Sequence, residues 1–136
     1  MQPLFSWPVR VYYEDTDAGG VVYHANYVQF LERARTEWLR DRGFEQDRLM
    51  AEDHLVFAVA GMEIRFRRPA RFNDLLRVSV DAVEGGRTRM TLDQSVVRDS
   101  DGELMTTARV RVACLDARSF RPTSLPETMA EKLLDE

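Results

Sequence analysis

The chain has 136 residues, of which 44% are hydrophobic and 31% are charged, and its net charge is −4. This length suffices for one modest core, so we expect a single domain over residues 1–136. The acidic balance argues against a general binder of nucleic acid. Residues 1–11 lack a basic segment followed by a long apolar run, and no later stretch approaches membrane-spanning length. We therefore expect no signal peptide and no membrane insertion, and we place the protein in the cytoplasm.

The first half of the chain predicts a strand and then one long helix. Phe5–Tyr13 is rich in β-branched and aromatic residues, and Pro8 marks this strand as an edge or a bulge. Apolar residues recur at helical spacing from Asn26 to Arg42, with charged residues on the other side. Gly43 is expected to end this helix at its C′ position, and Gln46–Glu52 predicts a further helical turn.

The second half changes to strand periodicity. Alternating apolar residues predict strands at about 62–66, 75–83, 87–97 and 103–116. The Gly85-Gly86 pair and Asp99–Gly102 supply tight turns between them, and Pro126–Leu134 predicts a short terminal helix. The lone Cys114 lies in the last strand, where we expect it to be buried, without a disulfide and without a partner for metal binding.

This order of elements predicts an α+β fold. A single antiparallel sheet of about five strands would carry the long helix on its inner face. Such a sheet keeps open edges that invite pairing with another copy, so we expect a homo-oligomer.

One stretch, YYEDTDAGGVVYHANYVQFLERARTEW from Tyr12 to Trp38, concentrates the chemistry of the chain at the start of the long helix. The acids ahead of the helix are Glu14, Asp15 and Asp17, and His24 is one of only two histidines in the chain. In a purely structural interpretation Asp15 or Asp17 caps the helix, the glycines make a turn and His24 is a structural histidine. That interpretation accounts for one acid but not for the glycine pair, which lets a ligand approach the backbone. We expect Asp15 to accept hydrogen bonds within the loop and Glu14 to face solvent.

Other chemistries are excluded by the motifs that are missing. The stretch lacks the oxygen ligands and closing glutamate of a calcium loop, so we expect no metal. The zinc-protease, phosphate-loop and dinucleotide patterns are absent, and no serine lies in a nucleophile elbow. If the protein is a hydrolase, a carboxylate must carry the reaction.

The stretch resembles the signature of the hotdog-fold acyl-CoA thioesterases, in the branch of 4-hydroxybenzoyl-CoA thioesterase and more narrowly the Tol–Pal-associated YbgC type. The similarity runs from Phe5 to about Pro126, through RPARFNDLLRV and the ending RVACLDARSFRPTSLP. It implies a strongly curved antiparallel sheet wrapped around the long helix. It also implies homodimers or homotetramers with active sites at the dimer interface, an acyl-CoA substrate and no cofactor.

The resemblance assigns roles to residues of the motif. Asp17 corresponds to the catalytic aspartate, a backbone N–H near His24 polarises the thioester carbonyl, and Tyr23 and His24 line the site. The loop residues expected to bind substrate are Gly19, Gly20 and Val21. Because a thiolate with a conjugate-acid pKa of about 8.5 leaves readily, a carboxylate and a carbonyl-polarising group suffice. Asp17 would act either as a nucleophile that forms a mixed anhydride or as a general base on water.

Arginines are the candidates for binding the phosphates of coenzyme A. Arg65, Arg67, Arg68 and Arg71 lie within seven residues. Arginine geometry suits phosphate, although any one of these side chains can equally form a solvated or salt-bridged strand face. The expected phosphate ligands are Arg67, Arg68, Arg87 and Arg121, with Arg89 as a further candidate.

Two functions of different classes follow. The first is an acyl-CoA thioesterase, with a hydroxybenzoyl-CoA preference as the second choice of substrate. The alternative is a non-catalytic hotdog module that docks acyl carrier protein or the partners of the Tol–Pal and phospholipid-synthesis systems, since a fold does not fix a function. Asp17 favours the enzyme, because a docking module does not need it.

Overall fold

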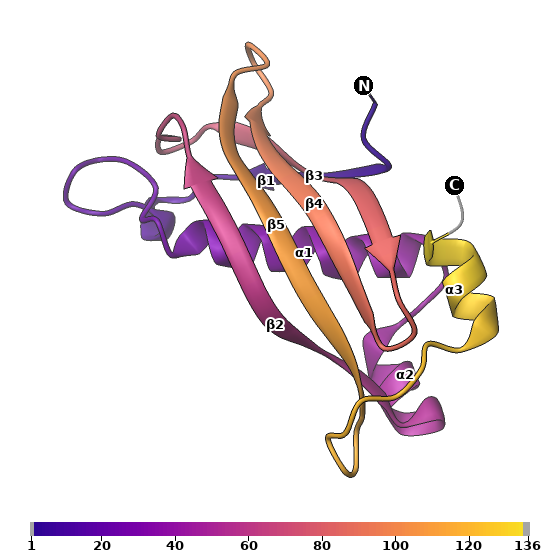
Figure 1. The fold of residues 1–136 in the computed structure, drawn as a ribbon. Coiled ribbons are helices and arrows are strands. Elements are labelled where there is room, and N and C mark those ends of the chain that lie inside the picture. The colour runs from indigo at the N-terminus through magenta and orange to yellow at the C-terminus, as the bar shows by residue number, and fades with distance from the viewer. Residues whose placement is uncertain (1, 135–136) are drawn as a thin grey trace.

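The computed structural model describes residues 2–134, in which a single antiparallel sheet has the strand order β1-β3-β4-β5-β2 (Figure 1). The strands are β1 (Phe5–Arg10), β2 (Leu55–Phe66), β3 (Leu75–Gly85), β4 (Arg89–Arg98) and β5 (Leu104–Asp116). The helices are α1 (Asn26–Asp41), α2 (Gln46–Asp53) and α3 (Glu127–Leu134), with a 3₁₀ turn, η1, at Tyr13–Asp15. The predicted α+β arrangement of five strands and one long helix is confirmed.

Most boundaries lie within two residues of those predicted. β2 is one exception, since it begins at Leu55, seven residues before the predicted Met62. The first strand is the other. It ends at Arg10 instead of Tyr13 because Tyr13–Asp15 turn into η1. The long helix ends at Asp41, one residue early, and Gly43 follows with a φ of +97°. This left-handed conformation at C′ is the one that glycine adopts without strain, as the sequence predicts.

Strand order is a feature that the alternation of residues did not reveal. β2 pairs with β5, whereas β3 pairs with β1 and β4. The connection over residues 67–74 therefore crosses between two separate parts of the sheet instead of closing a hairpin. β1, which contains Pro8, and the longer β2 are the two edges of this sheet.

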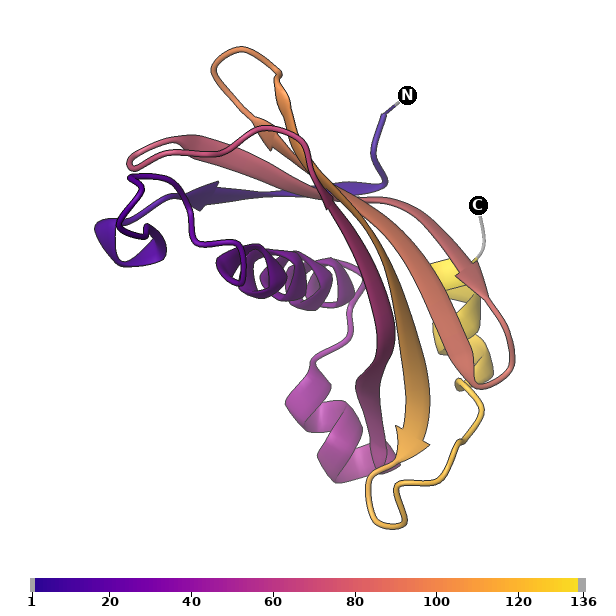
Figure 2. The same cartoon turned by 60° about the vertical axis from the view of Figure 1, so that its left-hand side comes forward.

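The sheet curves around α1, which lies against its concave face (Figure 2). Four apolar side chains of α1 are fully buried against this face, namely Phe30, Leu31, Ala34 and Trp38. They meet inward-facing residues of the strands such as Leu76, Val78, Leu92 and Val110. Cys114 is buried in β5, as predicted. Within residues 2–134, none of the helices is both long and apolar enough to cross a bilayer.

Candidate active site

The loop that carries Asp17 is a tight turn held by the backbone. Asp17 N–H donates to Val21 O and Gly20 N–H donates to Asp17 O, each at 2.9 Å. Gly20 has a φ of +82°, which a side chain would disfavour. Gly19 N–H donates to Asp17 Oδ1 at 2.9 Å, and a Cβ on Gly19 would lie 3.2 Å from that same oxygen. The turn therefore fixes one carboxylate oxygen of Asp17, while the side chain as a whole is exposed.

Asp15 has a different role, because it is buried with 6% of its surface exposed. Its Oδ2 accepts Tyr12 N–H at 2.8 Å, and its Oδ1 accepts the Asn26 side-chain amide at 2.9 Å. Its backbone carbonyl accepts Tyr23 N–H at 2.8 Å. As predicted, Asp15 accepts hydrogen bonds within the loop, and in doing so it ties the loop to the first residue of α1.

The start of α1 is not capped by a side chain. The N-cap residue is Ala25, and no acid lies in the first turn. Asp15 bonds the Asn26 side chain and Asp17 bonds its own loop, so the interpretation in which either acid caps the helix is wrong. In residues 2–134 the N–H groups of His24 and Ala25 have no protein acceptor. Such free donors, at the positive end of the helix dipole, favour a negatively charged or strongly polar ligand.

A cleft of about 200 Å³ opens beside this helix start. The residues that line it are Val22, His24, Tyr27, Phe66, Arg67, Arg68 and Pro69. The His24 ring lies 6.2 Å from that of Phe66 and 4.7 Å from that of Tyr23. The structure thus brings His24 together with two of the arginines that the sequence nominated.

The arginine-bearing loop is fixed to the site by two hydrogen bonds through Ala70. Val22 N–H donates to Ala70 O at 2.8 Å, and Ala70 N–H donates to the Tyr27 hydroxyl at 3.1 Å. Burial raises the pKa of Tyr27, so its phenol stays protonated. Val21 also forms an isolated bridge with Arg71. These contacts hold Arg67 and Arg68 next to the helix start.

Other predicted residues do not share this cleft. Asp17 lies outside its lining, on the exposed turn. Arg87 and Arg121 lie at the opposite end of the sheet. Thr88, the neighbour of Arg87, accepts a hydrogen bond from Cys114 N–H near one end of β5. Phe66 of the cleft is paired with Thr106 near the other end of β5. Cys114 and Thr106 are eight residues apart, or about 26 Å along an extended strand.

Sequence reasoning missed several residues of the site, among them Asn26, Tyr27 and Phe66. It assigned Asn26 and Tyr27 only to the helix and Phe66 only to a strand. Asn26 had one signal, since it is an amide side chain at the predicted helix start and can donate a hydrogen bond to a nearby acid. Among the described residues, no three His, Cys, Asp or Glu side chains gather in a way that would hold a metal ion.

Comparisons with known proteins, by family, by sequence and by structure, all find thioesterases. The family described as the thioesterase-like superfamily matches residues 11–133. A relative from Escherichia coli O6:H1, named acyl-CoA thioester hydrolase YbgC, is 46% identical and aligns over 93% of this chain and 92% of its own. A crystal structure of a probable thioesterase from Bartonella henselae has a TM-score of 0.83 and 36% identity, covering 89% of this chain and 98% of that one. Slr0204 from Synechocystis, a 1,4-dihydroxy-2-naphthoyl-CoA thioesterase, shares the fold, with a TM-score of 0.88, 22% identity and 96% of both chains covered.

Proposed function

The chain belongs to the thioesterase-like superfamily, and from that premise we propose that it hydrolyses the thioester bond of an acyl-CoA to a free acid and coenzyme A. The resemblance read from the motif agrees with this membership, and the five-stranded curved sheet agrees with the hotdog fold. The observation that carries the proposal is the pair of free N–H donors at the uncapped start of α1, beside a loop that presents a carboxylate.

In the proposed reaction the thioester carbonyl oxygen accepts the His24 and Ala25 N–H groups. These donors stabilise the oxyanion, and one such donor is typically worth about 10²–10³ in rate. Asp17 supplies the remaining chemistry through Oδ2, the oxygen that Gly19 does not hold. As a nucleophile it attacks the carbonyl carbon, the C–S bond breaks, and water hydrolyses the mixed anhydride. As a general base it takes a proton from the water that attacks.

Tyr23 and His24 are proposed to line the site, and Gly19, Gly20 and Val21 to shape the loop against the substrate. Tyr23 is half-exposed beside the His24 ring. An aromatic wall on this side would exclude water from the reacting carbonyl and strengthen the hydrogen bonds that the carbonyl accepts.

The test of Asp17 is Asp17→Asn, with thiol release from acyl-CoA as the assay. We expect kcat to fall about a thousandfold, the range of a lost general base or nucleophile, with KM changed little. The matched control is Glu14→Gln, an exposed acid in the same loop that lies outside the cleft. It should keep the wild-type rate. Retention of most activity in Asp17→Asn would reject the assignment.

Arg67 and Arg68 are proposed to bind the phosphates of coenzyme A, because they line the cleft and are exposed. Charge reversal at both should raise KM for an acyl-CoA more than for a pantetheine thioester that lacks the nucleotide. Equal effects on the two substrates would remove these arginines from the phosphate site. Arg87 and Arg121 would require a second subunit to reach the same substrate.

We place the homo-oligomer contact at the β2 edge. β2 is twice as long as β1, with 12 residues against 6, and lacks the proline that blunts the other edge. Val59 and Phe66 on β2 are 49% and 52% exposed. A dimer or tetramer by light scattering, reduced to a monomer by Val59→Glu, is the expected result. An unchanged mass in that variant would move the contact elsewhere.

The alternative function is a docking module for acyl carrier protein or an envelope partner. It predicts binding of such a protein with no hydrolysis of any acyl-CoA, so the wild-type assay over a chain-length series with benzoyl-CoA separates the two classes. The acyl carrier protein partner and the cytoplasmic location remain predictions from the sequence.

A further inference from the structure

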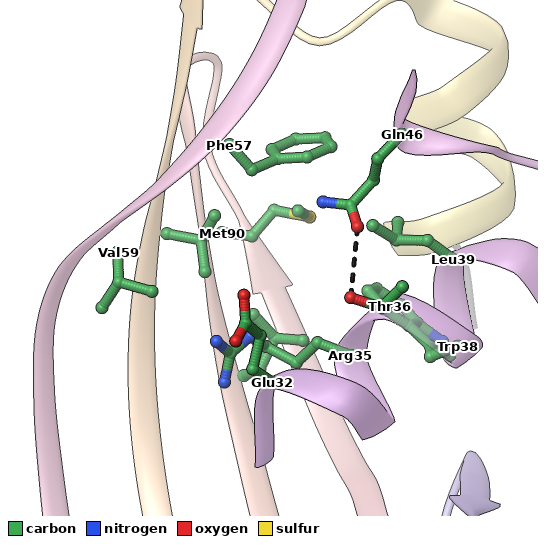
Figure 3. A pocket seen from close by; sticks show the side chains of 11 residues that line it. Glu32, Arg35, Thr36, Trp38, Leu39, Gln46, Phe57, Val59 and Met90 are labelled. Atoms are coloured by element: carbon green, nitrogen blue, oxygen red, sulfur yellow. Dashed lines mark hydrogen bonds between the residues drawn. The ribbon is translucent and has the colours of Figure 1, made fainter. Parts of the chain in front are cut away.

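A second cavity lies between α1 and the inner face of the sheet, away from the helix start (Figure 3). It encloses about 80 Å³. Its sheet side is apolar and its helix side is partly polar. The sheet residues are Phe57, Val59, Met90, Leu92 and Val112, and the helix residues are Glu32, Arg35, Thr36, Trp38, Leu39 and Gln46.

Glu32 and Arg35 are the charged residues of this lining, and Gln94 holds Arg35 in place. Gln94, with only 1% of its surface exposed, accepts Arg35 Nη1 through Oε1 at 3.1 Å. The amide nitrogen of Gln94 donates to Leu31 O at 3.1 Å and to Ser79 O at 3.3 Å, which fixes its orientation. Burial lowers the pKa of Arg35, and the charge of Glu32 opposes that effect. Within residues 2–134, Arg35 makes no salt bridge, so its one side-chain acceptor is a neutral amide.

An apolar row connects this cavity to the candidate active site. Beyond the buried Leu55, the inward-facing residues of β2 are Phe57, Val59, Met62, Ile64 and Phe66. Each lies opposite an inward-facing residue of β5 in the register, from Cys114 at one end to Thr106 at the other. None of the five is charged, and four follow one another from the cavity to the cleft. Phe66 lines the cleft beside His24, and Val59 lines the cavity beside Arg35.

We propose that this row carries the acyl chain of the substrate and that Arg35, held by Gln94, sets the length of an unsubstituted chain at about ten to twelve carbons. The proposal rests on the proposed function, which places the thioester carbonyl at the start of α1. Arg35 lies about ten residues further along the helix, or about 15 Å, and helical side chains lean back toward the N-terminus. A fully extended hydrocarbon chain with C–C bonds of about 1.5 Å advances about 1.3 Å per carbon, so a chain of that reach has about ten to twelve carbons.

The limit follows from what each carbon meets. A methylene that leaves water for the apolar row improves transition-state binding roughly fourfold. Carbons beyond the row would displace the remaining water from the Arg35 guanidinium without offering it an acceptor. Within residues 2–134 the one side chain that accepts a hydrogen bond from Arg35 is a neutral amide, and the Glu32 carboxylate nearby forms no salt bridge with it. Removing water from such a charge is unfavourable, so the gain per carbon stops there.

The experiment measures kcat/KM for straight-chain acyl-CoAs from four to sixteen carbons and for benzoyl-CoA. In the wild type we expect a rise up to ten or twelve carbons and then a plateau or fall, with benzoyl-CoA slower than decanoyl-CoA. In Arg35→Met the ratio of hexadecanoyl-CoA to octanoyl-CoA should rise at least tenfold. The conservative Arg35→Lys should keep a ratio near that of the wild type, because it retains the charge.

Arg33→Met is the matched control. It makes the same substitution on the same helix, but at a residue outside the cavity and the row. Its ratio should stay within twofold of the wild type. Val59→Trp provides an independent test if Arg35→Met does not fold, because a bulky side chain in the cavity wall should move the optimum to shorter chains. The inference would be overturned if Arg35→Met hydrolysed acyl-CoAs with the same chain-length profile as the wild type. If Arg35→Met does not fold, the same result in Val59→Trp would overturn it. Either result would assign the row to subunit contact alone. Absence of hydrolysis for every acyl-CoA would instead overturn the proposed function.

Discussion

Asp15 and Asp17 are two residues apart, and the structure predicts opposite consequences for their removal. Asp15→Ala takes away the acceptor of the Tyr12 N–H and of the Asn26 amide, two part-buried hydrogen bonds to a buried carboxylate. A buried donor left without an acceptor costs about 1–3 kcal/mol, so two such donors lower the free energy of unfolding by about 3 kcal/mol. The entropy of unfolding of a chain of 136 residues is about 0.29 kcal/mol/K, so the melting temperature should fall by about 10 °C.

Asp17→Ala should have the reverse pattern. Asp17 is exposed, and among residues 2–134 its side chain accepts only the Gly19 N–H, which water can satisfy. The expected stability change is about 0.5 kcal/mol, while hydrolysis should be lost. Scanning calorimetry and thiol release on the same preparations measure both quantities. If Asp17→Ala lowered the melting temperature as much as Asp15→Ala, or if Asp15→Ala left it unchanged, the division into an anchoring acid and a reacting acid would be refuted.

Three further predictions follow from individual side chains. Gly19→Ala should lower kcat about tenfold with little change in melting temperature, because its Cβ would press on Asp17 Oδ1 at 3.2 Å; an unchanged kcat would contradict this. Burial raises the pKa of Cys114 to about 11, so iodoacetamide at pH 8 should modify it only after unfolding in urea, as read by mass spectrometry. The Arg98 guanidinium holds the pKa of Asp101 at about 2. This pair favours the folded state above about pH 4 and the contribution is lost toward pH 2, so Asp101→Asn should narrow the gap between the melting temperatures at pH 7 and pH 2.

The sequence determined the elements of this protein because each one is set by local periodicity. The apolar spacing of Asn26–Asp41 defines α1, and the alternation along β3, β4 and β5 defines those strands. Gly43 ends α1 as expected, since its left-handed conformation is a local requirement. The motif from Tyr12 to Trp38 pointed to the family for the same reason, as its residues are contiguous.

The tertiary structure decided how distant residues meet. Local spacing could not show that β2 pairs with β5 instead of β3, because both pairings satisfy the same alternation. Nor could it show that neither Asp15 nor Asp17 caps α1, since that depends on where the loop folds back. Arg35 and Gln94 are 59 residues apart, and only the packing of α1 on β4 makes them a pair. A contact of that kind arises from the whole sheet, which no short stretch of sequence encodes.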